Sequence, residues 1–269
     1  MIRDKETDIL YNKWQSPAPA AVFLLVHGLG AHTGRWEFLS GFFLEKRISS
    51  YAIELKGFGE TRDLKGHIDS FRIYLKDIRS LYNIIIREYK DKKVFLIGES
   101  IGAVISFLMA IEEPDLFSGL ICLSPAFAGR LKTTPLTYIR RFLPLIYNPK
   151  KQFEIPFDPR MCTRDTAYQK VMETDFREHR LATSKFAFEF MIAQAQSGVL
   201  KDRVRTPVFF LVAGEDKLAD PEASKRIFRG LKVEDKTIIQ YPGMYHSLSI
   251  DLGRERVFGD ILKWVRERI

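Results

Sequence analysis

Short apolar runs alternate with longer amphipathic segments along much of the chain. The runs at 21–26, 94–97, 120–123 and 208–213 are continuous in aliphatic and aromatic residues, a pattern typical of strands buried on both faces of a parallel sheet. Further strands are expected at 7–14, 51–54 and 236–241, and helices at about 35–46, 70–89, 103–110, 222–229 and from 254 onward. Strands that alternate with helices predict an α/β fold built on a mostly parallel, doubly wound sheet.

The alternation stops between about 125 and 198. This stretch predicts two helical segments, at 136–142 and 165–196, joined by connections that contain proline. It follows the strand at 120–123, and loops at the carboxyl ends of parallel strands surround the ligand crevice in such sheets. We therefore expect residues 1–125 and 199–269 to form the core, and residues 126–198 to form a helical cap, or lid, over the crevice.

The segment Gly98-Glu99-Ser100-Ile101-Gly102 lies between a strand-length apolar run and a helix-length one. A chain that turns from strand to helix within a few residues needs small residues at the crowded corner. Ser100 is then exposed at the apex, at the start of a helix whose free N–H groups favour a developing negative charge. The G-x-S-x-G pattern also occurs by chance, so a base, an acid and an oxyanion site are required elsewhere in the chain.

A serine nucleophile needs a histidine base, which in turn is oriented by a carboxylate. His246 stands in a Pro/Gly loop after the last predicted strand, and Asp216 follows the strand at 208–213. Both loops are expected at the same end of the sheet as Ser100. Glu215 and Asp220 share the loop of Asp216, but we interpret them as solvated, with Asp220 capping the next helix.

An oxyanion site needs two backbone N–H groups aimed at one point. Ile101, directly after the serine, is expected to supply one. Leu29 is expected to supply the other, because Gly28 and Gly30 allow the loop after the strand at 21–26 to bend toward the crevice.

The remaining histidines have structural interpretations. We expect His27 to hold its turn by hydrogen bonds, His32 and His67 to lie on the surface, and His179 to be solvated in a charged stretch of the cap. No His, Cys or carboxylate pattern has the spacing of a metal site, and no cofactor is expected.

Taken together, these motifs resemble α/β-hydrolases of the monoacylglycerol lipase and lysophospholipase-like group. The matching segments occur in the family's order at 27–30, 32–36, 57–61, 98–102, 123–125, 214–218 and 241–246. The resemblance implies a serine hydrolase that cleaves carboxylic esters of medium or long acyl chains, above all monoacylglycerols, through an acyl-enzyme. It implies Ser100 as the nucleophile, His246 as the base, Asp216 as its orienting acid, and the amides of Leu29 and Ile101 as the oxyanion hole.

The sequence also departs from that group. Glu99 stands where relatives usually have His, and Glu54 and Thr61 stand where Asp and Ser are usual. Ala31 and Ser249 replace more polar residues that similar monoacylglycerol lipases can show near the glycerol-binding mouth. The chemistry is unaffected, but lysophospholipase, broad carboxylesterase, thioesterase and aminopeptidase activities remain open.

Two alternatives come from other functional classes. Gly28, Gly30 and Gly34 follow a strand, and Glu54 ends the next one, as in an NAD(P)-dependent oxidoreductase. Such an enzyme has no need of a serine turn, an acid loop and a histidine loop. A non-catalytic binder of small apolar ligands would keep the fold, but such proteins usually lack one member of the triad.

More than half of the chain's excess positive charge lies in the predicted cap. The chain of 269 residues has a formal net charge of +8, and residues 126–200 hold 12 Lys and Arg against 7 Asp and Glu. The segment 138–147 mixes aromatic, aliphatic and basic residues. It could meet lipid acyl chains and anionic headgroups in transient contact with a membrane surface, or pack its apolar side on the core. No nucleic-acid-binding signature is present, and the sequence does not indicate an oligomeric state.

The compartment and the thiol chemistry follow from simple features. The N-terminus is charged and leads into no apolar stretch of signal-peptide length, and no run of about 18 apolar residues could span a bilayer. We expect a cytoplasmic protein, whose predicted cap could bring it into transient contact with the membrane surface. Cys122 and Cys162 are too few for a disulfide framework, and we expect both to be free thiols.

Overall fold

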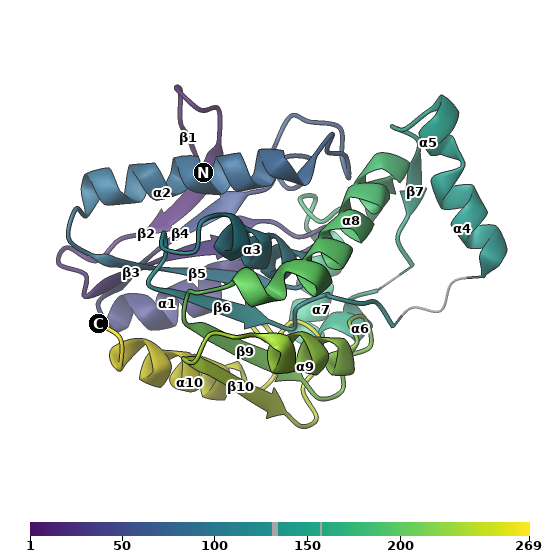
Figure 1. Cartoon of the computed structure of the whole chain (residues 1–269). Helices are drawn as coiled ribbons and strands as arrows, with labels where there is room; N and C mark the ends of the chain where they lie inside the picture. Colours follow the sequence, from purple (N-terminus) through teal and green to yellow (C-terminus); the bar gives the residue numbers. More distant parts are fainter. Residues whose placement is uncertain (131–133, 157) are drawn as a thin grey trace.

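A computed structural model describes residues 1–130, 134–156 and 158–269. Within these residues the central sheet has eight strands (Figure 1). In spatial order they are β1 (Ile2–Arg3), β2 (Leu10–Trp14), β4 (Ile48–Glu54), β3 (Ala21–Val26), β5 (Lys93–Glu99), β6 (Gly119–Leu123), β9 (Val208–Ala213) and β10 (Lys236–Tyr241). The strands from β4 to β10 are parallel, whereas β1 and β2 are antiparallel to their neighbours. The predicted α/β fold with a mostly parallel sheet is confirmed.

Helices cover both faces of this sheet. Along β3, Ala21, Phe23 and Leu25 pack against α1 (Glu37–Glu45) and α10 (Arg254–Arg266). The alternate residues Val22 and Leu24 face the opposite side, where α2 (Phe71–Glu88), α3 (Ile101–Glu112) and α9 (Pro221–Gly230) pack. Because successive side chains of a strand point to opposite faces, a continuous apolar run is what a doubly covered strand requires.

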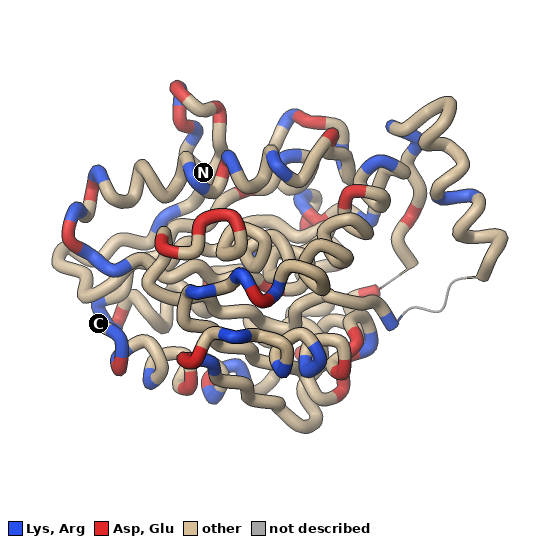
Figure 2. Tube along the Cα trace, in the orientation of Figure 1, with Lys and Arg blue, Asp and Glu red and all other residues tan. Residues whose placement is uncertain are grey.

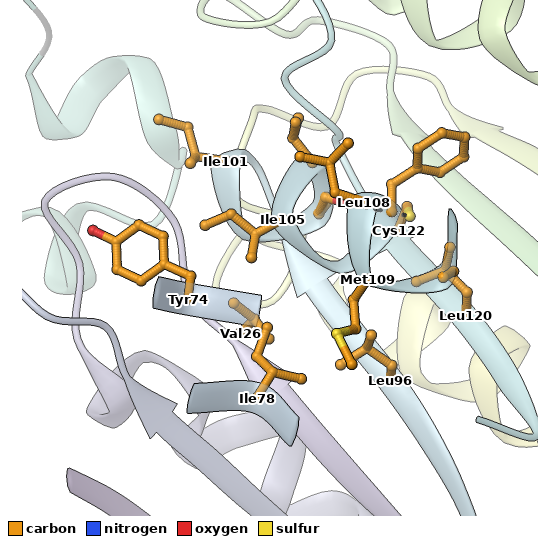
Figure 3. Packing of buried hydrophobic residues seen from close by; sticks show 14 of the residues in the cluster. Val26, Tyr74, Ile78, Leu96, Ile101, Ile105, Leu108, Met109, Leu120 and Cys122 are labelled. Atoms are coloured by element: carbon orange, nitrogen blue, oxygen red, sulfur yellow. Dashed lines mark hydrogen bonds between the residues drawn. The ribbon is translucent and has the colours of Figure 1, made fainter. Parts of the chain in front are cut away.

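Helix α3 is the most deeply embedded of the core helices. Residues 101–110 are all buried. Figure 3 shows Ile105 and Met109 between α2 and the strands that contain Val26, Leu96 and Leu120. A helix that is apolar on every side has no face for solvent. The first turn of α3 is consequently fixed at the carboxyl edge of the sheet.

The chain between β6 and β9 carries the expected insertion. It contains α4 (Pro135–Phe142), α5 (Pro144–Tyr147), β7 (Gln152–Glu154), α6 (Pro159–Cys162), α7 (Thr166–Thr174), β8 (Leu181–Thr183), α8 (Ser184–Leu200) and the short helix η2 (Lys201–Arg203). Residues 131–133 and 157 of the predicted cap lie outside the described residues. The division of the chain into 1–125, 126–198 and 199–269 stays a prediction.

The prediction of a single helical segment at 165–196 is wrong, because two helices separated by a strand lie there. Helix α7 ends at Thr174, and β8 pairs antiparallel with β7 before α8 begins. The intervening segment is held by the core, because the N–H of His179 donates to the carbonyl of Gly30 at 2.9 Å and that of Thr183 to the carbonyl of Gly66 at 2.8 Å. These long-range bonds replace the local i to i−4 bonds that would continue a helix.

Charged residues of both signs are interspersed over most of the molecule (Figure 2), but the region of α4 and α5 shows Lys and Arg with no acidic neighbour in the described range 134–151. No described helix is both long enough and apolar enough to cross a membrane. Cys122 and Cys162 are both buried free thiols, as predicted.

Candidate active site

Ser100 occupies a sharp turn between β5 and α3. Its backbone has φ 59° and ψ −120°, a conformation that residues other than glycine rarely adopt. The N–H of Ser100 donates to the carbonyl of Leu123 at 2.9 Å, which holds the turn on the neighbouring strand. Glycine is required on both sides, because a Cβ at Gly98 would lie 2.4 Å from the carbonyl oxygen of Gly102, and one at Gly102 would lie 2.2 Å from that of Val26.

Three side chains predicted from separate parts of the sequence lie in one hydrogen-bonded series. The Oγ of Ser100 lies 2.8 Å from Nε2 of His246, and Nδ1 of His246 lies 2.8 Å from Oδ2 of Asp216. The other carboxylate oxygen of Asp216 accepts hydrogen bonds from the N–H groups of Leu218 and Ala219, both at 2.8 Å. The carboxylate is therefore fixed by its own loop before it orients the imidazole.

Two opposing effects set the protonation of His246, which is 5% exposed. Burial removes the hydration of the imidazolium and by itself lowers the pKa. The charge and the hydrogen bond of Asp216, together with the charge of Glu99, outweigh this effect, so that the pKa of His246 is raised above its ordinary value. With Nδ1–H held by Asp216, the unprotonated Nε2 faces the hydroxyl of Ser100 as an acceptor.

The two residues expected to supply oxyanion N–H groups, Leu29 and Ile101, line the cavity that opens on Ser100. Ile101 is the first residue of α3, where an N–H has no acceptor within its own helix. The loop of Leu29 is fixed by His27, whose Nε2 accepts from the N–H of Leu55 at 3.0 Å and whose Nδ1 lies 2.8 Å from the carbonyl oxygen of Gly28. The structural interpretation of His27 is confirmed.

The prediction that His32 and His67 lie on the surface is wrong. His32 is 4% exposed, with its Nε2 3.3 Å from a carboxylate oxygen of Asp175, and burial lowers its pKa to about 3. The side chain of His67 is 10% exposed, and its Nδ1 lies 3.0 Å from Oγ1 of Thr183. His179 is half-buried rather than solvated. His32 and His67 are covered by Asp175 and Thr183 of the chain between β6 and β9, whereas His179 of that chain lies against the core, where its N–H donates to the carbonyl of Gly30.

Sequence reasoning missed Arg35 and Glu178. Arg35 is 6% exposed and lines the cavity. It donates from Nε and Nη2 to the two carboxylate oxygens of Glu178 at 2.6 and 2.7 Å. Glu178 lies 143 residues further along the chain, and no pattern near either residue indicates this pairing.

Asp251 was missed as well. It is fully buried and accepts hydrogen bonds from the N–H of Tyr245 at 2.8 Å and from the N–H of Arg164 at 2.7 Å. Tyr245 directly precedes His246, so Asp251 connects the histidine loop with the segment between α6 and α7. A lone aspartate in a C-terminal loop gives no sequence signal for this role.

A cavity of about 320 Å³ opens on Ser100 beneath the insertion. Its walls are mainly apolar and include Leu29, Ile101, Phe142, Phe153, Ile155, Phe186, Phe190, Met191 and Leu218. Such a surface can bury an alkyl chain next to the serine but offers few partners for polar groups.

The residues described around this site are not arranged to bind a metal ion or a dinucleotide. No three His, Cys, Asp or Glu side chains in the described part of the chain gather as metal ligands would. Glu54, which could bind a ribose, is 3% exposed and accepts from the N–H groups of Thr33 at 2.9 Å and Glu60 at 3.1 Å. Its carboxylate is thus already used in holding the glycine turn.

Comparisons with known proteins point in one direction. A family model described as serine aminopeptidase, S33, matches residues 17–253. The monoglyceride lipase of Homo sapiens is 27% identical over 256 residues, which cover 93% of this chain and 84% of that protein. Phospholipase YtpA of Bacillus subtilis is 24% identical over 250 residues, covering 91% and 95%. The chain also matches an uncharacterized abhydrolase domain-containing protein of Dictyostelium discoideum at 26% identity, and spans 28% of its length.

Solved structures agree with these sequence matches. The crystal structure of the Paleococcus ferrophilus monoacylglycerol lipase has a TM-score of 0.88 and 27% identity, covering 97% of this chain and 99% of that one. A soluble variant of the Saccharomyces cerevisiae monoglyceride lipase, in complex with a substrate analog, has a TM-score of 0.85 at 21% identity, covering 96% and 91%. The second similarity bears on the fold alone.

Proposed function

The chain belongs to the family described as serine aminopeptidase, S33, and from this premise we propose that it hydrolyses monoacylglycerols through an acyl-enzyme formed at Ser100. It is an α/β-hydrolase and a carboxylic ester hydrolase, similar to monoglyceride lipases. The observation that carries the proposal is the continuous series from Ser100 Oγ through His246 to Asp216, with both distances 2.8 Å, at the floor of an apolar cavity.

In the first half of the reaction, Ser100 Oγ attacks the ester carbonyl carbon and passes its proton to His246 Nε2. Asp216 stabilises the imidazolium that forms. The amides of Leu29 and Ile101 bind the oxyanion of the tetrahedral intermediate, whose negative charge the N-terminus of α3 also favours. The intermediate collapses when His246 returns the proton to the leaving glycerol oxygen, and Ser100 keeps the acyl group.

In the second half, water replaces glycerol. His246 takes a proton from the water, whose oxygen attacks the acyl carbon, and a second tetrahedral intermediate forms in the same oxyanion hole. His246 then protonates Ser100 Oγ as the acyl–oxygen bond breaks, and the fatty acid leaves. No metal or cofactor enters these steps.

An acyl ester fits the walls of the cavity better than a peptide does. Phe153, Phe186 and Phe190 supply apolar area for a chain of methylene groups but no partner for successive peptide amides. An aminopeptidase also needs a carboxylate for the substrate's terminal ammonium group. Glu99 lies in the wall, but both of its carboxylate oxygens already accept hydrogen bonds from Ser249.

Covalent labelling and a substrate panel test this proposal. A fluorophosphonate should label the wild-type protein at Ser100 and fail to label Ser100→Ala. The rates should be higher for monoacylglycerols than for lysophospholipids, aminoacyl anilides or p-nitrophenyl acetate. Labelling without hydrolysis of any acyl ester would contradict the enzymatic proposal and favour a ligand binder, whereas a preference for lysophospholipids would reassign the substrate.

We also propose that α4 and α5 contact the surface of an anionic membrane. Helix α4 has no buried residue, and Ile146 and Tyr147 of α5 are 84% and 63% exposed. Arg140 and Lys150 are exposed beside them, and both helices lie at the periphery of the molecule, away from the sheet (Figure 1). Apolar side chains among cations match the interfacial region of an anionic bilayer.

Vesicle binding tests this surface. The double variant Arg140→Glu and Lys150→Glu should bind vesicles of phosphatidylglycerol and phosphatidylcholine at least about tenfold more weakly, because each cation near such a surface contributes about 1 kcal/mol. The matched control Lys90→Glu and Lys92→Glu makes the same charge change at exposed residues after α2, and should bind like the wild type. Unchanged binding by the first variant would rule out the membrane contact. Loss of a wild-type dimer in light scattering would instead assign the surface to a second copy.

A further inference from the structure

A second buried carboxylate, that of Glu99, lies in the wall of the cavity outside the series described above. Glu99 ends β5 directly before Ser100 and is 5% exposed. Its Oε1 accepts from the N–H of Ser249 at 3.0 Å, and its Oε2 accepts from the Oγ–H of the same residue at 2.9 Å. Ser249 lies three residues after His246. One carboxylate therefore joins the strand that presents the serine to the loop that presents the histidine.

Among the residues that the structure describes, Glu99 has no partner of opposite charge. Buried carboxylates are ordinarily paired with a cation, because an ionised group loses its hydration on burial. None of the ion pairs among the described residues includes Glu99, and the buried Arg35 binds Glu178 instead. Burial raises the pKa of Glu99, while the two hydrogen bonds from Ser249 oppose that rise. A neutral glutamine could also bond with Ser249, so hydrogen bonding alone does not account for a carboxylate here.

The charge of Glu99 acts on the imidazole. The charged groups that act on His246 are Asp216, Glu99 and Arg35; the two carboxylates favour the protonated ring and Arg35 opposes it. The ring must carry a proton whenever Ser100 is attacking or leaving the acyl carbon. In a site with little water, a second nearby negative charge stabilises that cation.

Building on the proposed ester hydrolysis, we propose that Glu99 is a positioning residue, which holds the His246 loop against the serine turn through Ser249 and lends the imidazole a second negative charge. Glu99 acts through His246 and need not touch the substrate. Removing its charge makes His246 easier to deprotonate, so the base stays active at lower pH. Removing the hydroxyl of Ser249 loosens the loop but leaves the charge in place.

The test compares the pH dependence of Ser100 labelling by a fluorophosphonate in matched variants. In Glu99→Gln the acid-side midpoint should move to lower pH by about half a unit to one unit. Glu99→Asp keeps the charge and should return the midpoint to within about 0.2 unit of the wild type. Glu215→Gln removes a carboxylate that is exposed beside Asp216 and should not move it. A midpoint in Glu99→Gln equal to that of the wild type would overturn the charge effect.

Ser249→Ala tests the hydrogen-bonding role, and remains informative if Glu99→Gln does not fold, as judged by its circular dichroism. We expect labelling several-fold slower across the whole pH range, with the wild-type midpoint. Wild-type rate and midpoint in this variant would overturn the loop-holding role. Labelling is independent of the acyl substrate, so a wild type that is labelled but hydrolyses no ester refutes the proposed function alone. A wild type that is not labelled at any pH refutes both proposals.

Discussion

At the scale of single residues, the two oxygens of Asp216 have separate tasks, since one accepts from His246 and the other from its own loop. In Asp216→Asn the side-chain NH2 group replaces the oxygen that faces His246. Because this group donates a hydrogen bond, Nδ1 must accept it, and the imidazole is left in the wrong tautomer. We expect kcat for a short p-nitrophenyl ester to fall by about 10³ to 10⁴. Asp220→Asn, on the same loop, should keep kcat, because Asp220 caps α9 and pairs with the exposed Arg226, away from His246. Equal activity of wild type and Asp216→Asn would exclude Asp216 as the residue that orients His246.

The raised pKa of His246 predicts a specific pH profile. In the proposed mechanism the ring must be unprotonated to accept the proton of Ser100. We therefore expect kcat/KM to fall on the acid side with a midpoint above about 6.5, the ordinary value for histidine. The contribution of His246 to the free energy of unfolding has the opposite pH dependence. The protonated ring stabilises the fold fully below about pH 6.5, and this contribution is lost as the pH rises through the pKa of His246 in the folded state. Profiles recorded from about pH 5 to 9 check this, and a midpoint below the ordinary value would refute it.

The proximity of the three proposed catalytic residues could be predicted from the sequence. Ser100, Asp216 and His246 each follow a strand, and the ends of parallel strands meet at one edge of a sheet, so their proximity follows from topology. Arg35, Glu178 and the role of Glu99 do not follow in this way. Their partners are distant in the chain, and only the packed structure brings them together.

At the scale of elements, the turn from β5 to α3 is the most constrained. In Gly102→Ala the new Cβ would lie 2.2 Å from the carbonyl oxygen of Val26, and backbone cannot move aside there. We expect the free energy of unfolding to fall by more than about 3 kcal/mol. The control Gly259→Ala lies inside α10 with no atom within 4 Å of the new Cβ, and should gain up to about 1 kcal/mol. Urea unfolding of both variants checks the contrast.

Elements whose stability is local were predictable, whereas those shaped by contact with distant chain were not. The N-cap of α2 by Ser70, whose Oγ accepts from the N–H of Arg72, agrees with the expected helix start. The break between α7 and α8 has no comparable local cause. The helical pattern continues through it, and the core carbonyls of Gly30 and Gly66 make the extended form more favourable. The strand predicted at 7–14 is β2, and it lies second in the sheet because Ile2 and Arg3 of β1 pair outside it.

For the whole molecule, the buried pair of Arg35 and Glu178 is a main attachment of the insertion to the core. Glu178→Gln leaves a buried guanidinium without its counter-charge, so we expect a loss of about 3 to 5 kcal/mol in the free energy of unfolding. Arg87→Gln, which breaks the exposed pair with Glu6, should change stability by less than about 0.5 kcal/mol. Urea unfolding measures both, and equal midpoints for the two variants would contradict the attachment.

The position of the insertion in the chain also bears on how the protein is made. Ser100 and the strands around it lie before the insertion, whereas Asp216 and His246 come after it, and β6 cannot pair with β9 until the whole insertion has been synthesised. On the proposed mechanism, a ribosome-bound chain therefore carries its nucleophile without a base until β10 and the loop after it have been synthesised. Closing so long a loop is entropically costly and slows folding. On that mechanism, we expect no ester hydrolysis before β10 and the loop of His246 complete the sheet.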